Sequence, residues 1–325
     1  MKAIIHTQYG PPDVLELIEL EKPAPRDDEV LVKIHAASVN AYDWHLLTAD
    51  IFLVRLMGGG LLKPKDTSMG ADIAGQVEAV GVNVKQFIQG DEVFGDIAGS
   101  GQSGFAEYCC VREKQLALKP ANLSFEQAAA VPMAGITALQ GLRDKGQIKP
   151  GQKVLIQGAS GGVGTFAVQI AKYYGAEVTA VTSTGNVDQA RALGADHVID
   201  YKKEDFTKSG QQYDLILAAN GHHTLSAYKR ALTPKGIYVM AGGTFAQIFQ
   251  SMLLGPRYSE KGGRQLGGVS AKQSQDDLAF LRELLDAGKV IPVIDRRYPL
   301  SEAIEAVRYL GTGHARGKVV ITMKN

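Results

Sequence analysis

A glycine-rich turn between a strand pattern and a helix pattern is the feature that most constrains the fold. Residues 154–157 are strand-like, with three apolar residues before Gln157, and residues 163–171 place apolar side chains on one helical face. The turn carries Gly158, Gly161 and Gly164. A Cβ at the first would obstruct the tight turn, at the second it would hold the backbone away from a pyrophosphate, and at the third it would push the helix off its strand. This context predicts a dinucleotide-binding turn, with a plain βα turn as the alternative.

The residues of this turn are the first candidate binding residues. A helix start offers unpaired backbone N–H groups and a positive dipole end to phosphate oxygens. We therefore expect the pyrophosphate of a dinucleotide to contact Gly158, Ala159, Ser160, Gly161, Gly162, Val163 and Gly164.

Strand and helix patterns alternate around this turn, from residue 124 to residue 272. Ser124 and Gln127 form a capping box that opens a helix at Phe125. Alternating β and α segments predict a parallel, doubly wound sheet, which is a Rossmann domain. Its expected strands are 153–157, 177–182, 197–200, 213–218, 236–241 and 264–271, and one of its expected helices is 222–232.

The first 123 residues show many short strand patterns separated by glycines, which predicts a small β-barrel. The last strand pattern, Lys318–Thr322, has no neighbouring strand in the sequence, so we expect it to join that barrel. The predicted domains are therefore a discontinuous barrel domain, residues 1–123 and 273–325, and a nucleotide-binding domain, residues 124–272.

Size and composition narrow the function classes. A chain of 325 residues suits two domains, and a net charge of +1 with spread-out lysines and arginines argues against nucleic acid as a partner. No apolar run approaches membrane-spanning length, and the N-terminus lacks a signal-peptide pattern. Cys109 and Cys110 are neighbours on a strand pattern, so we expect them to be buried or half-buried thiols. A cytoplasmic, disulfide-free protein without a membrane or nucleic-acid partner is predicted.

The segment after the second strand of the alternating region bears on the choice of cofactor. NAD-specific turns carry an acidic residue roughly 20 residues after the glycines, whereas this turn carries Ser183, Thr184 and Asn186. A carboxylate would repel a 2′-phosphate, so its absence favours NADPH. The turn also lacks Arg and Lys, which leaves NADH as the alternative. Tyr201, with the two lysines after it, is a further candidate contact.

Six other segments accompany the glycine turn in a fixed order: 37–44 (ASVNAYDW), 70–75 (GADIAG), 90–95 (GDEVFG), 104–108 (GFAEY), 132–138 (PMAGITA) and 193–201 (LGADHVIDY). Together with the turn they resemble the zinc-independent quinone oxidoreductases of the medium-chain dehydrogenase/reductase superfamily. The resemblance implies an α/β protein with a GroES-like β-barrel domain, a Rossmann domain and a cleft between them, assembled as a homodimer.

The resemblance also implies site residues. It places Asn40, a catalytic candidate and cofactor contact, at the nicotinamide and substrate end of the cleft, followed by the further catalytic candidates Tyr42 and Asp43. Packing within the domain core is the alternative for Tyr42 and for Trp44. The other cofactor contacts that it implies are Thr137, Asn220 from a shifted position, Gly242, Gly243 and Lys318. A backbone-bonded helix hydroxyl is the alternative for Thr137, and a plain strand residue is the alternative for Lys318.

The residues argue against a metal. A catalytic zinc needs three Cys, His or acidic ligands. Where zinc-dependent relatives carry a Cys and a His-Glu pair, this chain has Asn40 and Ala71-Asp72, and it has only two cysteines. The adjacent His222 and His223 suit one metal poorly.

Without a Lewis acid, the reaction suits a small electrophilic acceptor that takes hydride readily. We therefore expect a zinc-independent, NADPH-dependent oxidoreductase that acts on a quinone or an α,β-unsaturated carbonyl. The alternatives are an enoyl-thioester reductase of the same fold and a cofactor-binding protein without enzymatic activity that binds RNA or a protein partner.

Overall fold

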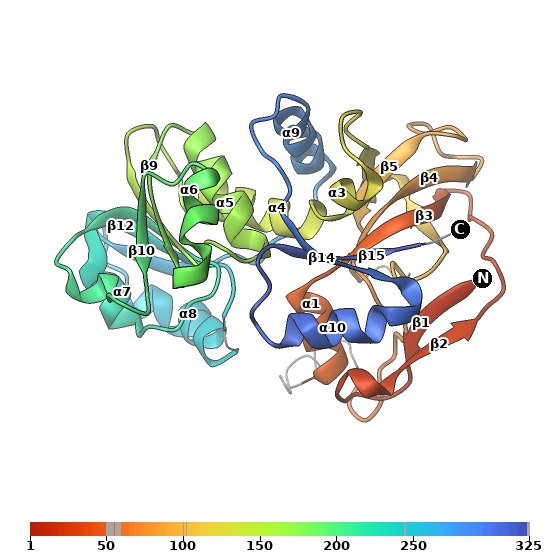
Figure 1. The fold of residues 1–325 in the computed structure, drawn as a ribbon, viewed down its shortest axis with the longest axis horizontal. Coiled ribbons are helices and arrows are strands. Elements are labelled where there is room, and N and C mark those ends of the chain that lie inside the picture. The colour runs from red at the N-terminus through yellow and green to blue at the C-terminus, as the bar shows by residue number, and fades with distance from the viewer. Residues whose placement is uncertain (50–54, 56–59, 100, 102, 244, 324–325) are drawn as a thin grey trace. The chain divides into compact units, whose positions relative to one another are not determined.

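The computed structural model describes residues 1–49, 55, 60–99, 101, 103–243 and 245–323, without the side chains of residues 245, 246, 248, 249 and 252. The chain forms two compact units (Figure 1). The first unit comprises Met1–Met133, Gln273–Asp286 and Pro292–Asn325, and the second comprises Ala134–Lys272 and Ala287–Ile291. This division differs from the predicted boundary after residue 123. The reason is that helix α3 (Phe125–Ala129) packs against strands of the first unit.

The main sheet of the first unit has the order β14-β15-β3-β4-β5-β7, and β6 also pairs with β3. The long strand β3 pairs with β6 along its first half and with β15 along its second half. The predicted joining of the last strand to this sheet is therefore confirmed. The strands are β3 (Glu29–Val39), β4 (Asp72–Val80), β5 (Glu92–Asp96), β6 (Tyr108–Arg112), β7 (Leu116–Leu118), β14 (Ile294–Pro299) and β15 (Lys318–Thr322). The polar β14 and the three-residue β7 lack the apolar alternation on which the predictions depended.

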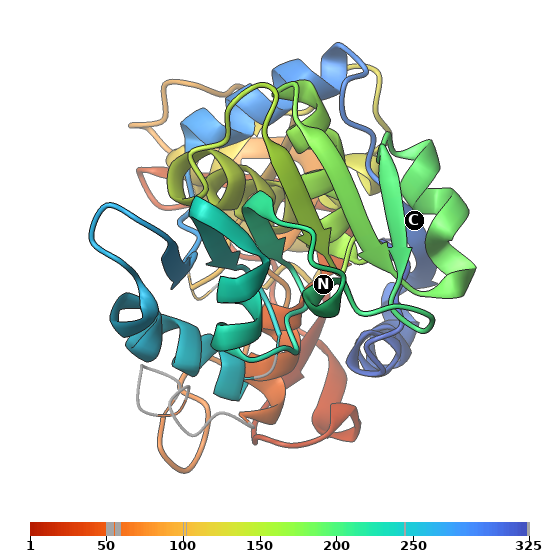
Figure 2. The ribbon, with the colours of Figure 1, turned by 90° about the vertical axis from the view of Figure 1, so that its left-hand side faces the viewer.

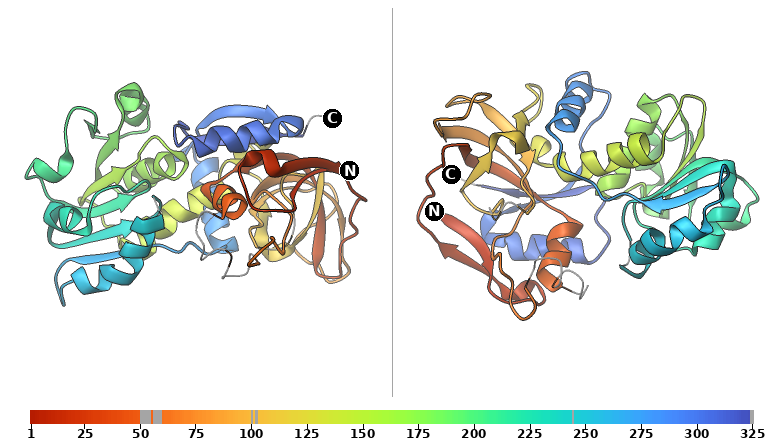
Figure 3. Two further views of the ribbon diagram at one scale, coloured as in Figure 1. Left: turned by 90° about the horizontal axis from the view of Figure 1, so that it is seen from below. Right: turned by 180° about the vertical axis from the view of Figure 1, so that it is seen from behind.

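Helices and a hairpin complete the first unit. Strands β1 (Lys2–His6) and β2 (Leu15–Glu19) form an antiparallel pair. Helix α1 (Ala41–Thr48) lies beside α10 (Ala303–Gly311), as the views in Figure 3 show. A Cβ at Gly311 would overlap the ring of Trp44, so this ring packs between the two helices. Trp44 therefore packs within the first unit, which was the alternative to a contact with a ligand. Helix α9 (Gln275–Asp286) also belongs to this unit.

The second unit is built on a six-stranded parallel sheet of order β10-β9-β8-β11-β12-β13 (Figure 2). The order reverses between β8 and β11, so helices cover both faces. The predicted doubly wound sheet is confirmed. The strands are β8 (Lys153–Gln157), β9 (Glu177–Thr182), β10 (His197–Asp200), β11 (Tyr213–Ala218), β12 (Leu232–Met240) and β13 (Gln265–Gly268). The helices are α4 (Pro132–Gln140), which the unit boundary crosses, α5 (Gly162–Tyr173), α6 (Val187–Ala192), α7 (Leu225–Ala231) and α8 (Phe245–Tyr258).

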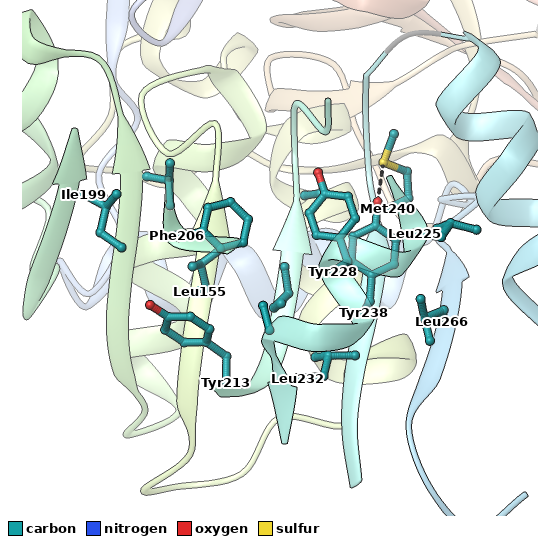
Figure 4. Close-up of a cluster of buried hydrophobic side chains, with 14 residues drawn as sticks. Leu155, Ile199, Phe206, Tyr213, Leu225, Tyr228, Leu232, Tyr238, Met240 and Leu266 are labelled. Atoms are coloured by element: carbon teal, nitrogen blue, oxygen red, sulfur yellow. Dashed lines mark hydrogen bonds between the residues drawn. The ribbon is translucent and has the colours of Figure 1, made fainter. Parts of the chain in front are cut away.

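A buried cluster of aromatic and aliphatic side chains packs within this unit (Figure 4). The rings of Tyr228 and Tyr238 stack with centroids 4.2 Å apart. The Tyr228 hydroxyl accepts the backbone N–H groups of His222 and His223, which keeps these residues in a loop. Helix α7 therefore begins at Leu225, after the N-cap Thr224, and the predicted start at residue 222 is wrong.

Two local predictions are confirmed. Ser124 and Gln127 exchange both hydrogen bonds of the capping box before α3. Cys109 and Cys110 are buried free thiols on β6, and burial raises the pKa of the Cys110 thiol to about 11. Among the described residues, no helix combines the length and the apolar character that a membrane crossing requires.

Candidate functional site

A row of buried polar side chains crosses the sheet of the first unit at one end. Antiparallel register places Ser38 on β3 opposite Asp72 on β4, and Asp72 opposite Asp96 on β5. Lys318 begins β15 beside Asn40, which follows β3. We call Ser38, Asn40, Asp72, Asp96 and Lys318 the polar row. Its members are far apart in the sequence, and strand pairing brings them together.

Asp72 is the centre of the polar row. Its Oδ2 accepts hydrogen bonds from Ser38 Oγ at 3.0 Å and from Asn40 Nδ2 at 2.9 Å, and Lys318 Nζ lies 3.3 Å away. Its Oδ1 accepts from the backbone N–H of Met133 at 2.9 Å. A buried carboxylate needs such compensation, since an unpaired buried charge is strongly destabilising.

Asn40 is the N-cap of α1, and its side-chain amide is occupied by protein groups. Nδ2 donates to the Ser38 carbonyl at 3.3 Å as well as to Asp72, and Oδ1 accepts from Lys318 Nζ. An amide has two N–H donors, and both are used here. Asn40 therefore holds Lys318 and Asp72 in place and has no donor left for a ligand.

Asp43, a predicted catalytic residue, is only 1% exposed. Its Oδ2 accepts from the backbone N–H of Asn40 at 2.7 Å and its Oδ1 from that of Gly70 at 3.2 Å. Burial raises the pKa of this carboxyl to about 7, with a further contribution from Asp72, and the two N–H groups and Lys318 oppose the rise. The geometry gives Asp43 a positioning role, because it joins the start of α1 to the Gly70 segment.

Tyr42, which with Asn40 and Asp43 makes up the predicted catalytic residues, is 39% exposed on α1. Partial burial raises the pKa of its phenol, and the charges of Asp43, Asp66 and Asp96 add to this effect. Burial and the charge of Asp72 raise the pKa of the Asp96 carboxyl to about 6. A phenol is protonated at neutral pH, and these effects favour that form, so the Tyr42 hydroxyl stays a candidate donor.

In the second unit, the glycine turn has the geometry that the spacing predicted. Gly158 has φ +76°, a conformation that favours glycine. A Cβ at Gly164 would overlap the carbonyl oxygen of Gly158, whereas a Cβ at Gly161 would meet only that oxygen, at 3.6 Å. Gly161 thus leaves open space beside the start of α5, where the N–H groups of Gly162 and Val163 have no acceptor among the described residues. The turn therefore fits a pyrophosphate. In the absence of a ligand, position 161 has room for a Cβ, so packing within the chain does not require glycine there.

Asn186 joins the glycine turn to the turn after β9. Its Nδ2 donates to Ser160 Oγ and to Ser183 Oγ, each at 3.1 Å. The structure therefore brings three predicted cofactor residues together, and it orders the two turns relative to each other.

Asp200, at the end of β10, is a site residue that the sequence analysis missed. Its Oδ2 accepts from Thr184 Oγ1 at 2.7 Å, and Lys203 Nζ lies 3.7 Å away. The Thr184 hydroxyl, the Lys202 N–H and Lys203 keep the pKa of Asp200 below its usual range. A carboxylate therefore does stand beside the turn that was predicted to lack one. The predicted parallel pairing of β10 with β9 could have revealed this neighbour, because it places Asp200 opposite Thr182, just before the turn. Tyr201, the next residue, is 51% exposed.

The loops after β11 and β12 run close to the glycine turn. A Cβ on Gly158 would lie 2.9 Å from the Cβ of Asn220, so this predicted residue adjoins the turn. The Gly221 N–H donates to the Gly242 carbonyl at 3.1 Å, and Gly243 has φ +142°. Thr137 is half-buried on α4, and no described hydrogen bond links its hydroxyl to the turn.

Gln157, the last residue of β8, was also missed. Its Oε1 accepts from Tyr228 Oη at 2.5 Å, and its Nε2 lies 3.0 Å from His222 Nδ1. Its role is to hold the loop after β11. Among the described residues, no group of three or more His, Cys, Asp and Glu side chains is arranged to hold a metal.

Comparison with known proteins places these two parts in one family. Residues 26–121 match the alcohol dehydrogenase GroES-like domain, and residues 193–321 match the zinc-binding dehydrogenase domain. The chain is 37% identical to 2-methylene-furan-3-one reductase of Solanum lycopersicum, over 99% of this chain and 79% of that protein. It is 33% identical to the chloroplastic NADPH-dependent alkenal/one oxidoreductase of Arabidopsis thaliana, over the same shares of the two chains.

A solved structure agrees with this comparison. The quinone oxidoreductase from Coxiella burnetii superposes with a TM-score of 0.88 at 32% identity, covering 100% of this chain and 99% of that one. The fold, the glycine turn and these relatives together show that the chain is an oxidoreductase that belongs to the quinone oxidoreductase-like family of the medium-chain dehydrogenase/reductase superfamily.

Proposed function

We propose that this protein is an NADPH-dependent reductase of quinones or α,β-unsaturated carbonyl compounds that works without zinc. The observation that carries the proposal is the Lys318–Asp72 pair, in which a buried ammonium occupies the polar row. Relatives named as an alkenal/one oxidoreductase and a quinone oxidoreductase support the acceptor class. When bound, the nicotinamide cofactor supplies the hydride, and the protein residues bind it and orient it.

The second unit supplies the residues that would hold this cofactor. The N–H groups at the start of α5 and the space beside Gly161 suit the pyrophosphate. Ser183, Thr184 and Asn186 suit the ribose, and Tyr201 with Lys203 suits a 2′-phosphate. Lys203 also offsets the negative charge of Asp200, which supports NADPH over NADH. The name of the Arabidopsis relative agrees with this choice.

The polar row supports a reaction without zinc because the oxygen acceptors of Asp72 and Asn40 are already occupied by protein donors. Zinc binding requires deprotonated ligands with free lone pairs. Here Asp72 accepts four hydrogen bonds from protein groups, and Asn40 Oδ1 accepts from Lys318. A metal would have to displace the ammonium and break this arrangement.

We also propose a homodimer with a small electrophilic molecule as its substrate and a cytoplasmic location. The buried free thiols Cys109 and Cys110 support a reducing compartment. Size-exclusion chromatography with light scattering and cell fractionation test these two points.

Parallel titration with NADPH and NADH, followed by nicotinamide fluorescence, tests the cofactor. A quinone, a simple enone and a crotonyl thioester are then added to the bound complex, after dialysis against a chelator. We expect tight NADPH binding and oxidation by the quinone or the enone that survives dialysis. Turnover of the thioester alone would identify an enoyl-thioester reductase, and activity that is lost on dialysis and restored by zinc would refute the zinc-free reaction.

A further inference from the structure

We propose that the Lys318 ammonium, positioned by Asn40 and Asp72, contacts the carbonyl oxygen of the acceptor and stabilises the negative charge that hydride transfer places there. This inference rests on the proposed function, since it assigns the group that polarises the acceptor.

The argument starts from the donors of Lys318. An ammonium carries three N–H donors and no acceptor. Two of them are directed to Asn40 Oδ1 and Asp72 Oδ2. Within the described part of the chain, the third has no acceptor. The Lys318 side chain is 3% exposed, so bulk water does little to satisfy this donor. Buried donors are normally paired, and an unpaired one indicates an acceptor that the folded chain does not provide.

The same bonds exclude the neighbouring groups from this role. Both N–H groups of the Asn40 amide are used by Ser38 and Asp72. Asp72 and Asp43 present carboxyl oxygens that already accept from backbone or side-chain donors. In the polar row, Lys318 is therefore the group with positive charge and a donor to spare. Asn40 and Asp72 are positioning residues, which hold the ammonium in one orientation.

The chemistry follows from this placement. Hydride adds to the carbon β to the carbonyl group, and the π electrons move onto the carbonyl oxygen to form an enolate. An N–H donor and a positive charge in a partly water-free site stabilise that oxygen more than the neutral carbonyl, which lowers the barrier. Water then supplies one proton to the enolate, so one hydride and one proton complete the reduction. Lys318 keeps its charge throughout.

The test compares acceptors in Lys318→Met, which keeps most of the length of the side chain and removes its charge. Loss of one oxyanion donor lowers kcat by roughly 10²–10³-fold in other enzymes. We expect a loss of about that size for a simple enone. For 1,4-naphthoquinone, which accepts hydride with less assistance, we expect a loss at least about tenfold smaller. NADPH affinity should stay unchanged, because this proposal assigns the Lys318 ammonium to the acceptor and not to the cofactor contact that the resemblance implied. Equal losses for both acceptors would overturn the proposal.

Matched controls separate this role from folding. Lys119 is another buried lysine of the first unit, bonded to the carbonyl groups of Pro120 and Leu123. Lys119→Met should therefore leave the ratio of enone to quinone turnover unchanged. If Lys318→Met does not fold because Asp72 is left unpaired, the double variant Lys318→Met/Asp72→Asn removes both charges and should show the same loss with the enone.

A second readout does not depend on turnover. 4-Nitrophenol resembles the enolate when ionised, and its absorbance reports ionisation. We expect the wild-type chain, with or without NADP⁺, to lower the pKa of bound nitrophenol by about one unit, which is a tenfold preference for the phenolate. Lys318→Met should abolish this preference. Absence of the preference in the wild type, or its persistence in the variant, would refute the role of Lys318 even if the proposed reaction is wrong.

Discussion

Two glycines of the same turn should respond in opposite ways to a single methyl group. At Gly164, an added Cβ overlaps the Gly158 carbonyl oxygen and lies 2.7 Å from the Ala159 Cα, and these are backbone atoms that no rotamer change can move. Overpacking of this kind costs roughly 1–3 kcal/mol. We therefore expect Gly164→Ala to lower the unfolding midpoint by several degrees, at about 2–4 °C for each kcal/mol.

At Gly161, the same methyl group meets only the Gly158 oxygen, at 3.6 Å. The backbone angles there, φ −81° and ψ 177°, are open to any residue, so Gly161→Ala should be neutral or stabilise the fold by about 0.4–1 kcal/mol. The methyl group fills the space proposed for the pyrophosphate. Loss of one hydrogen bond to a charged group, about 1.5–3 kcal/mol, weakens cofactor binding roughly 10- to 100-fold.

Thermal unfolding without ligand and nicotinamide fluorescence titration measure the two effects separately. We expect Gly161→Ala to unfold at or slightly above the wild-type midpoint and to bind the cofactor more weakly. We expect Gly164→Ala to unfold at a lower temperature than the wild type. If Gly161→Ala bound the cofactor as the wild type does, the pyrophosphate would not lie against this turn. If Gly161→Ala unfolded at the lowered midpoint of Gly164→Ala, the conclusion that there is room for a Cβ at Gly161 would be wrong.

Three further substitutions test other parts of the site. Because burial raises the pKa of Asp43 from 3.8 to about 7, the folded state is favoured when this carboxyl is protonated, and stability falls as pH rises from about 4 to about 7. Asp43→Asn, which cannot ionise, should remove most of that decline, up to roughly 4 kcal/mol, in urea unfolding across this range; an unchanged slope would contradict the assignment. Asp200→Asn removes a carboxylate bonded to Thr184 and should raise NADPH affinity relative to NADH roughly threefold to tenfold, whereas an unchanged ratio would place the 2′-phosphate elsewhere. Asn186→Ala breaks the links to Ser160 and Ser183 and should raise the cofactor Kd about tenfold with little change in thermal midpoint, and a wild-type Kd would show that the turns hold their positions without it.

Local features of the sequence were sufficient for much of the fold. The capping box at Ser124, the glycine turn and the strands β8 to β11 were predicted because their signals lie within a few residues of one another. Helix α8 was not predicted, and its sequence, with Pro256 inside the helix, shows why local propensity is only a weak guide. The start of α7 was misplaced because the backbone N–H groups of His222 and His223 donate to the Tyr228 hydroxyl, which keeps the two histidines in a loop.

The site residues divide in the same way. Residues of the glycine turn could be assigned from the sequence, since a tight turn and a close helix need glycine whatever surrounds them. The role of Asn40 could not, because its amide partners, Ser38, Asp72 and Lys318, come from three different strands. Asp200 came to lie beside Thr184 through the pairing of β10 with β9.

The amino-acid order alone determined where most strands of the second unit form and which turn can approach a phosphate, because those signals depend mainly on near neighbours. Only the folded arrangement decided which polar groups are already paired and which are left over. That decision depends on the register between strands that lie far apart in the chain, and it leaves the Lys318 ammonium with one donor to offer.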